Sequence, residues 1–242
     1  MNQKVAIVTG GTGALGRAIT DKLSEDGIKI YIPTRDIEKF NKVYDRSQNA
    51  DAAEFNLKMI FSFNCDITDE NSVFEFVSNI GALENGRIDY LINAAGGIDK
   101  PVKTAELTTG SFMNMLNLNF MSAFYFSREV MKYMIKNNFG RIISFGSKSS
   151  TEITQNRFAY SYSKRGVTEL MNVLSEENKN NNIRCNTIIP GIIDTSSNRE
   201  WGSDDEIKNW TKTHDIAEIV SDLISDKFKS LRSAELKLYN SI

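Results

Sequence analysis

Tyr160 and Lys164 form the pair of residues in this sequence that is best suited to acid–base chemistry. Residues four apart lie on one face of a helix, and the pattern from Tyr160 to Asn178 predicts a helix. A phenol has a pKa of about 10, but a neighbouring cation favours the phenolate and lowers that pKa. The pair therefore predicts a group that gives a proton to a carbonyl oxygen or takes one from an alcohol. Of the eight tyrosines, only Tyr160 has a lysine four residues later.

A glycine-rich turn near the N-terminus predicts a site for a dinucleotide. The run Thr9-Gly10-Gly11-Thr12-Gly13-Ala14-Leu15-Gly16 lies between a predicted strand and a predicted helix. Glycines let the backbone approach a pyrophosphate closely, and a helix N-terminus supplies free N–H groups and the positive end of a dipole. Gly11, Gly13 and Gly16 satisfy the GxGxxG spacing. The alternative is a flexible turn without a ligand.

The end of the second predicted strand bears on which dinucleotide binds. In such folds an acid at this point favours the free 2′-hydroxyl of the adenosine ribose, whereas an arginine accommodates a 2′-phosphate. Here Arg35 is followed directly by Asp36. The planar guanidinium of Arg35 suits a phosphate, so we expect NADP(H) to be favoured over NAD(H), although Asp36 lies near the spacing of a ribose-binding acid. Both residues could instead form a solvated surface pair.

The elements that must position these residues alternate between strands and helices. Short apolar runs predict six strands, Val5–Thr9, Ile28–Ile32, Met59–Phe63, Tyr90–Asn93, Arg141–Phe145 and Arg184–Ile189. Helical spacing is found at Leu15–Glu25, Ser72–Ile80, Ser111–Asn137 and Tyr160–Asn178. Strands separated by helices pair in parallel through right-handed crossovers. We expect an α/β fold, a doubly wound parallel Rossmann-type sheet with helices on both faces, as one domain over residues 1–242.

The composition argues against several other classes of protein. A formal net charge of -2 without a basic block argues against a nucleic-acid or anionic-membrane partner. The uncharged stretch near residues 107–127 contains asparagines and a glycine, which favours a buried helix over a membrane span. Two cysteines and no secretory signal favour a reducing, cytoplasmic location. No His, Cys and acid cluster has metal-ligand spacing, and the single histidine, His214, receives no catalytic role.

Further motifs follow the glycine turn in a fixed order. They are Cys65-Asp66-Ile67-Thr68-Asp69, Asn93-Ala94-Ala95-Gly96, Leu118-Asn119, the strand Gly140–Phe145 leading to Gly146-Ser147, Tyr160 with Lys164, and Ile189-Pro190-Gly191-Ile192-Ile193-Asp194-Thr195. With the turn, this series resembles the short-chain dehydrogenase/reductase family over nearly the whole chain. Ser147 lies thirteen residues before Tyr160, as the family pattern requires.

The resemblance implies a role for each matching residue. Tyr160 is the general acid–base, Lys164 lowers its pKa and binds the nicotinamide ribose, Ser147 hydrogen-bonds the substrate oxygen, and Asn119 supports a water that links Lys164 to solvent. The cofactor-binding residues that it implies, besides Tyr160 and Lys164, are Gly10, Thr12, Gly13, Leu15, Gly16, Arg35, Asp66, Ile67, Asn93, Ala94, Gly96, Leu118, Pro190, Gly191, Ile193 and Thr195. The expected reaction moves hydride between substrate carbon and nicotinamide and a proton on oxygen.

Some features depart from the family pattern or leave alternatives open. Ala14 stands where the common turn has glycine, and the C-terminus lacks the glycine-rich segment of many relatives. The short polar segment near residues 194–212 corresponds to a substrate loop, with its first part the best candidate for mobility. Trp201 and Trp210 close over substrate or anchor that loop. The apolar stripe of the helix at Ser111–Asn137 suggests a homodimer or homotetramer, or is buried within one subunit.

Three functional hypotheses remain at this point. The first is an NAD(P)(H)-dependent carbonyl reductase or alcohol dehydrogenase that acts on a small organic substrate. The second is a cofactor-binding sensor or scaffold without turnover, against which the complete Ser147, Tyr160 and Lys164 set argues. The third is a relative that uses the nicotinamide for a non-redox outcome such as dehydration or epimerisation.

Overall fold

A computed structural model describes residues 3–44 and 59–239 and contains one seven-stranded sheet. Its strands are β1 (Val5–Thr9), β2 (Lys29–Thr34), β3 (Ile60–Asn64), β4 (Tyr90–Asn93), β5 (Gly140–Phe145), β6 (Ile183–Pro190) and β9 (Glu235–Leu238). They lie in the order β3-β2-β1-β4-β5-β6-β9, and every neighbouring pair is parallel. The strand order reverses between β1 and β4, which is where ligands bind in doubly wound sheets.

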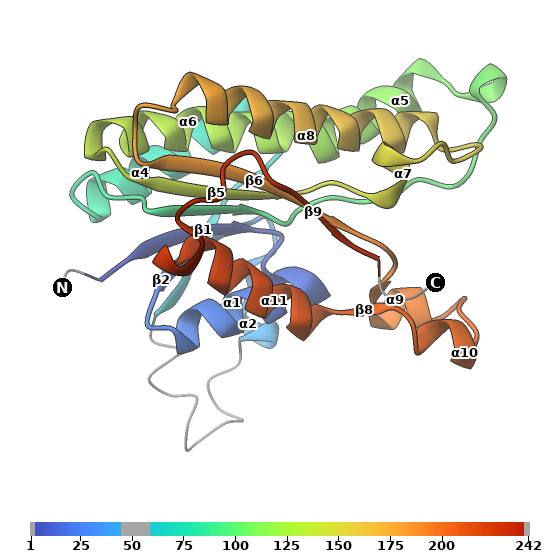
Figure 1. Ribbon diagram of the computed structural model, residues 1–242, viewed down its shortest axis with the longest axis horizontal. Coiled ribbons are helices and arrows are strands. Elements are labelled where there is room, and N and C mark those ends of the chain that lie inside the picture. Colours follow the sequence, from blue (N-terminus) through green and yellow to red (C-terminus); the bar gives the residue numbers. More distant parts are fainter. Residues whose placement is uncertain (1–2, 45–58, 240–242) are drawn as a thin grey trace.

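Helices cover both faces of the sheet (Figure 1). One face carries α1 (Ala14–Glu25), α2 (Ile37–Val43) and α11 (Thr213–Ile224), and the other carries α4 (Glu70–Leu83), α6 (Ser122–Asn137) and α8 (Phe158–Glu177). Side chains of β1 alternate between the two layers: Ala6 and Val8 belong to the core under α1 and α11, whereas Val5 and Ile7 belong to the core under α4, α6 and α8. The predicted single-domain α/β fold is confirmed.

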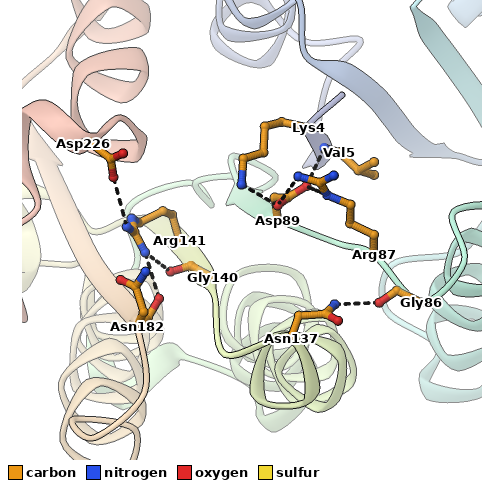
Figure 2. Close-up of polar contacts among 10 residues, drawn as sticks. All are labelled: Lys4, Val5, Gly86, Arg87, Asp89, Asn137, Gly140, Arg141, Asn182 and Asp226. Atoms are coloured by element: carbon orange, nitrogen blue, oxygen red, sulfur yellow. Dashed lines mark hydrogen bonds and ion pairs between the residues drawn. The ribbon is translucent and has the colours of Figure 1, made fainter. Parts of the chain in front are cut away.

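Charged groups tie the strands together at the amino-terminal edge of the sheet (Figure 2). Asp89, just before β4, accepts hydrogen bonds from Lys4 Nζ at 2.8 Å and from the backbone N–H of Val5 at 2.9 Å. Arg141 of β5 is 1% exposed and donates to the backbone carbonyl oxygens of Gly140 and Asn182, both at 2.9 Å. Because parallel strands all end at the opposite edge, this polar cluster lies away from the motifs identified above.

The predicted helix Ser111–Asn137 is interrupted in the structure. It consists of α5 (Thr109–Leu116), a five-residue π-helical turn (Asn117–Met121) and α6. A π turn inserts one extra residue into the helical repeat, which changes the face on which a side chain lies, and such turns are frequent at functional sites. Here the turn contains Asn119, whose side chain is buried. The prediction of one regular helix was therefore wrong at this point.

The remaining predicted elements need smaller corrections. The helix predicted from Tyr160 begins at Phe158, so Tyr160 lies in its first turn. β9 was not among the predicted strands, although Leu236 and Leu238 alternate with exposed Glu235 and Lys237 as a half-buried edge strand requires.

Short elements fill the loops between the longer ones. They are the 3-10 turns Thr104–Glu106 and Asp226–Phe228, the helices α7 (Lys148–Thr151), α9 (Ser196–Arg199) and α10 (Asp204–Ile207), and a two-stranded parallel sheet of β7 (Ile193–Asp194) and β8 (Thr211–Lys212). The segment expected to be mobile contains the short helices α9 and α10. Within the described residues, no helix has both the length and the apolar composition needed to cross a membrane.

Candidate active site

The glycine turn after β1 is tightly closed. Gly10 has a φ of +70°, and a Cβ at this position would lie 2.9 Å from the backbone of Ala95. A Cβ on Gly16 would lie 2.2 Å from the carbonyl oxygen of Gly10, so the first turn of α1 packs directly on the loop. The N–H of Gly13 closes the loop by donating to Gly10 O at 2.9 Å. The loop after β4 thus lies against the turn, as binding at the reversal of strand order requires.

The N-terminus of α1 is free of any side-chain cap among the described residues. Its N-cap is Gly13, no side chain accepts a hydrogen bond from its first N–H groups, and its first turn contains no acid. By contrast, Asp36, Asp69 and Thr108 cap α2, α4 and α5. Uncapped N–H groups and the helix dipole attract an anion. The residues present therefore fit a pyrophosphate here, and Ala14, the first residue of α1, is exposed.

Lys164, Asn119 and Gly96 meet behind this turn. Lys164 Nζ is buried and donates to the carbonyl oxygen of Phe145, at the end of β5, at 3.0 Å. A Cβ on Gly96 would lie 3.1 Å from Lys164 Nζ and 2.7 Å from Asn119 Oδ1, so a larger residue would push both groups aside. Burial lowers the pKa of Lys164 to about 8.

The Asn119 amide is held on both sides. Its Oδ1 accepts from the N–H of Gly97 at 2.9 Å, and its Nδ2 donates to Gly97 O at 3.0 Å and to Ser163 Oγ at 3.1 Å. Ser163 lies between Tyr160 and Lys164 on α8, and its hydroxyl donates to Tyr160 O at 2.8 Å. Asn119 therefore fastens the loop after β4 to the helix that carries the proposed acid–base residue.

Tyr160 and Ser147 are brought together by α8 and the end of β5. Burial raises the pKa of Tyr160, and a hydrogen bond with the Ser147 hydroxyl acts in the opposite direction. Ser147 is also the N-cap of α7, where its Oγ accepts from the N–H of Ser149 at 3.3 Å.

The expected lowering of the Tyr160 pKa by Lys164 is not found in the structure. Burial outweighs the opposing effects, and the cation that contributes is Arg157. The physical reason is that spacing on a helix shows which side chains share a face but not how deeply each is desolvated.

The two candidates for reading the adenosine ribose differ in their surroundings. Asp36 is the N-cap of α2, and its Oδ1 accepts from the N–H of Lys39 at 2.7 Å. Arg35 has a side chain that is 73% exposed, with Nη1 3.3 Å from Asp66 Oδ2. The Asp66 carboxylate also accepts from the backbone N–H and the hydroxyl of Thr68, and these hydrogen bonds lower its pKa. Arg35 is thus the more available group at the end of β2.

The other predicted cofactor residues lie at or after the carboxyl ends of β1, β3 and β4, or in the π-helical turn. Asn93 lies inside the protein, where its Nδ2 donates to Ser144 Oγ at 3.0 Å and Ser127 Oγ at 3.2 Å, so its side chain joins β4 to β5 and α6. Ala94 and Leu15 pack against the core under α1, and Ile67 packs against the core of the other face. Thr12 lies half-buried in the turn, and Leu118 Cδ2 would lie 2.9 Å from a Cβ on Gly97.

The segment after β6 leads from the site into the substrate loop. Pro190 ends β6, and the N–H of Gly191 donates to Leu238 O at 2.9 Å. Ile193 belongs to β7, which pairs with β8, and Thr195 is the N-cap of α9. Asp194 bonds Arg199 and, at 2.7 Å, Lys212 Nζ, and these two partners hold the pKa of its carboxyl well below its ordinary range.

The two tryptophans of the loop have different environments. Trp210 is 2% exposed and lies against Gly202, where a Cβ would be 2.2 Å from the ring. Trp201 is 60% exposed, and its ring centroid lies 5.1 Å from that of Trp210. Trp210 therefore anchors the loop, whereas Trp201 presents one side of its ring to solvent.

Some residues that hold the site were missed at the sequence level. Tyr44 OH donates to Gly11 O at 2.6 Å, and Thr9 Oγ1 accepts from the N–H of Ala95 at 3.1 Å. Thr9 stands directly before the first glycine, and a hydroxyl at the end of a strand could have been recognised as a hydrogen-bonding partner for a neighbouring loop. Nothing in the local pattern distinguishes Tyr44, because its contact depends on the path of the chain after β2.

Comparison with known proteins agrees with this arrangement. The family model described as short chain dehydrogenase matches residues 4–206. An uncharacterised oxidoreductase of Staphylococcus saprophyticus is 28% identical over 84% of this chain and 85% of its own. The 7alpha-hydroxysteroid dehydrogenase of Clostridium sardiniense is 30% identical over 79% of this chain and 71% of its own. The crystal structure of gox2181 superposes with a TM-score of 0.87 at 26% identity, covering 98% of this chain and 95% of that one. The chain is thus an oxidoreductase of the short-chain dehydrogenase family.

Proposed function

We propose that this protein interconverts a carbonyl and an alcohol on a small organic substrate with a nicotinamide cofactor, NADP(H) in preference to NAD(H). The observation that carries the proposal is that the loop after β4 contacts both the glycine turn before the uncapped α1, at Gly10, and the Lys164 ammonium group, at Gly96. Tyr160, with Ser147 as its neighbour, lies on the same helix as Lys164. A proton-transfer group and an anion-binding helix end are both needed for this reaction, and they come from distant parts of the chain.

Tyr160 moves the proton. In the reducing direction its hydroxyl gives its proton to the substrate oxygen, and in the oxidising direction the phenolate takes it. Ser147 lies beside Tyr160 and donates its single hydroxyl proton to the substrate oxygen when substrate is bound, which orients the carbonyl. When bound, the cofactor supplies or accepts the hydride at the substrate carbon.

Lys164 supplies the positive charge of the site, and its neighbours leave room for its N–H donors. With a pKa of about 8, Lys164 is mostly protonated at neutral pH, and one of its N–H groups is used by Phe145 O. An ammonium group has three donors, so the others are free to bind ribose hydroxyls. Gly96 leaves the space in which these donors lie, and Asn119 keeps the Gly97 loop in place.

The preference for NADP(H) rests on Arg35. Its side chain is exposed at the end of β2, whereas the neighbouring Asp36 carboxylate is engaged as a helix cap. A 2′-phosphate would compete with the Asp66 carboxylate for the Arg35 guanidinium, since a phosphate accepts stronger charge-assisted hydrogen bonds than a solvent-exposed partner at 3.3 Å.

We also propose that the protein forms a homodimer or a homotetramer in the cytoplasm. Half-buried Phe112 of α5 stacks on exposed Phe158 of α8 with a centroid distance of 5.8 Å, and Tyr162 lies beside both. An exposed aromatic group of this kind is typical of protein interfaces. Analytical ultracentrifugation of the intact protein measures its oligomeric state. A monomer at micromolar concentration would contradict this proposal.

The Tyr160→Phe variant tests the reaction. It should bind NADPH with wild-type affinity and lose turnover of a ketone by about 100-fold or more, because a general acid–base contributes that much. Absorbance of NADPH is measured with a panel of ketones, β-ketoacyl thioesters and sugars. Wild-type turnover in the variant would reject the assigned role of Tyr160. NADPH binding without turnover in the wild type would favour a sensor, and product formation without net NADPH consumption would favour a non-redox reaction.

The Arg35→Ala variant tests the cofactor preference. It should weaken NADPH binding by about 10- to 100-fold and leave NADH binding nearly unchanged, because it removes a charge-assisted bond to the phosphate. Asp36→Asn is the matched control, because an amide oxygen can still cap α2. Equal losses for both cofactors in Arg35→Ala would show that Arg35 does not read the 2′-phosphate.

A further inference from the structure

The C-terminal end of β9 contacts three separate parts of the candidate site. Leu238 O accepts from the N–H of Gly191, in the segment after β6, at 2.9 Å. The same oxygen accepts from Thr211 Oγ1, on β8 of the substrate loop, at 3.0 Å. The hydroxyl of the next residue, Tyr239, lies 2.8 Å from Thr151 Oγ1 at the end of α7. A strand at the sheet edge thus connects the Pro190–Gly191 segment, the substrate loop and the helix that follows Ser147.

The helix α7 depends on such outside contacts. It has four residues, Lys148–Thr151, and its N-cap is Ser147. A single helical turn is not stable by itself, because one or two hydrogen bonds do not offset the conformational entropy of forming it. Its backbone bonds run from Ser150 N–H to Ser147 O and from Glu152 N–H to Lys148 O. The backbone of Ser147 is held on one side by β5, since the N–H of Gly146 donates to Ile188 O at 2.9 Å, and its hydroxyl caps α7 on the other side, so a movement of α7 would move that hydroxyl.

Two side chains hold α7 from outside. Arg165 of α8 donates from Nε to Ser150 O at 3.1 Å. Tyr239 contacts two more residues of the turn: Lys148 Nζ lies over its ring, 5.3 Å from the centroid, and its hydroxyl lies 2.8 Å from Thr151 Oγ1. Thr151 Oγ1 donates its single proton to Lys148 O at 3.0 Å, so Tyr239 is the donor to Thr151. This chain of hydrogen bonds runs from Tyr239 through Thr151 into the backbone of α7.

We infer that Tyr239 is a positioning residue for Ser147, which it holds at the substrate oxygen by anchoring α7. The inference rests on the proposed function for its catalytic consequence. Tyr239 does not touch the reacting atoms; it acts through Thr151 and Lys148. The β9 strand itself is held by its backbone pairing with β6, in which Pro190 is paired with Leu238. Loss of the Tyr239 hydroxyl therefore leaves the strand in place and releases only α7.

The test uses the full chain with NADPH and a ketone that the wild type reduces. Tyr239→Phe keeps the ring and removes the donor, Thr151→Val removes the acceptor, and Thr151→Ser keeps it. We expect kcat to fall about two- to tenfold in Tyr239→Phe and in Thr151→Val, since this is the effect of one hydrogen bond, and to stay near the wild-type value in Thr151→Ser. The double variant should be no slower than either single variant, because both remove the same bond. Tyr133→Phe, a half-buried tyrosine that packs on Gly81 of α4, is the control without effect.

Three further readouts separate positioning from general loss of structure. NADPH affinity and binding stoichiometry should equal those of the wild type. The pH at which kcat reaches half its maximum in the alcohol-oxidising direction should move upward, since a displaced Ser147 no longer lowers the pKa of Tyr160. Hydrogen exchange of the Ser150 and Glu152 amides should be faster in Tyr239→Phe without any ligand.

The outcomes are distinct. Wild-type kcat and pH profile in both Tyr239→Phe and Thr151→Val would overturn the inference, as would a Thr151→Ser variant as slow as Thr151→Val. A fall in kcat matched by an equal fall in NADPH stoichiometry would also overturn it. A wild type that reduces no carbonyl would reject the proposed function instead, and unchanged amide exchange in Tyr239→Phe would then still reject the anchoring of α7.

Discussion

Replacement of Lys164 should make the protein more stable while it removes the activity. The wild type buries an ammonium group whose pKa falls from the ordinary value of 10.5 to about 8. This difference corresponds to about 3 kcal/mol of unfavourable free energy at neutral pH, where the lysine is protonated in both the native and the unfolded state. Met fills the same space without the charge. The variant also loses the hydrogen bond to Phe145 O, and this loss lowers its free energy of unfolding by about 1 kcal/mol. We therefore expect Lys164→Met to raise the free energy of unfolding by about 2 kcal/mol at pH 7.

The effect should depend on pH in one direction. Below pH 8 the wild type bears the whole cost of the buried charge. As the pH rises from about 8 to 10.5, the native lysine loses its proton before the unfolded one does, so the wild type gains stability relative to the variant. The advantage of Lys164→Met should accordingly disappear across this range.

Urea unfolding of the unliganded proteins at pH 7, 9 and 10 measures the effect. Lys136→Met, an exposed lysine of α6, is the control, with an expected change of less than about 0.5 kcal/mol at each pH. A Lys164→Met variant that is less stable than the wild type at pH 7, or a difference that does not change with pH, would refute the reasoning. Either result would mean that the ammonium group is compensated in the native state by contacts stronger than the bond to Phe145 O.

Two other perturbations test the turn and the substrate loop. Gly16→Ala should lower the free energy of unfolding by about 1 to 3 kcal/mol and abolish cofactor binding, because its Cβ would meet Gly10 O at 2.2 Å. Scanning calorimetry measures the stability and titration calorimetry measures NADPH binding. Gly110→Ala, whose Cβ would lie 4.0 Å from Thr108 Oγ1, is the control and should bind normally. Asp194→Asn should lower the Tm at pH 7 and expose residues 196–210 to proteases, since Arg199 and Lys212 lose their shared partner. Because these partners lower the pKa of Asp194, the difference in Tm should shrink as the pH falls below about 4, and a constant difference would contradict this.

Periodicity and motif order were sufficient to predict six of the seven strands of the main sheet and the presence of helices on both its faces. The runs Val5–Thr9 and Tyr90–Asn93 are strands with the predicted bounds, because short apolar segments between helices have few alternatives in a parallel sheet. The glycine turn was also predictable, since a strand, glycines and a helix in immediate succession leave little conformational choice. β9 was missed because two leucines alternating with charges in four residues are a weak signal, and its pairing with β6 spans about fifty residues of intervening chain.

The candidate site, like the fold, could be predicted from the sequence only in part. Sequence alone selected the residues to which we assign the chemistry: Tyr160 with Lys164 on one helical face, Ser147 thirteen residues earlier, and glycines before the first helix. Only the tertiary structure decided how deeply these residues are buried and which partners they have. It buries Lys164 and Tyr160 enough to shift both pKa values against the charged form, engages Asp36 as a cap, and brings Tyr239 to α7. The physical reason is that residue type and spacing are local, whereas desolvation and long-range hydrogen bonds depend on which distant elements pack around each group.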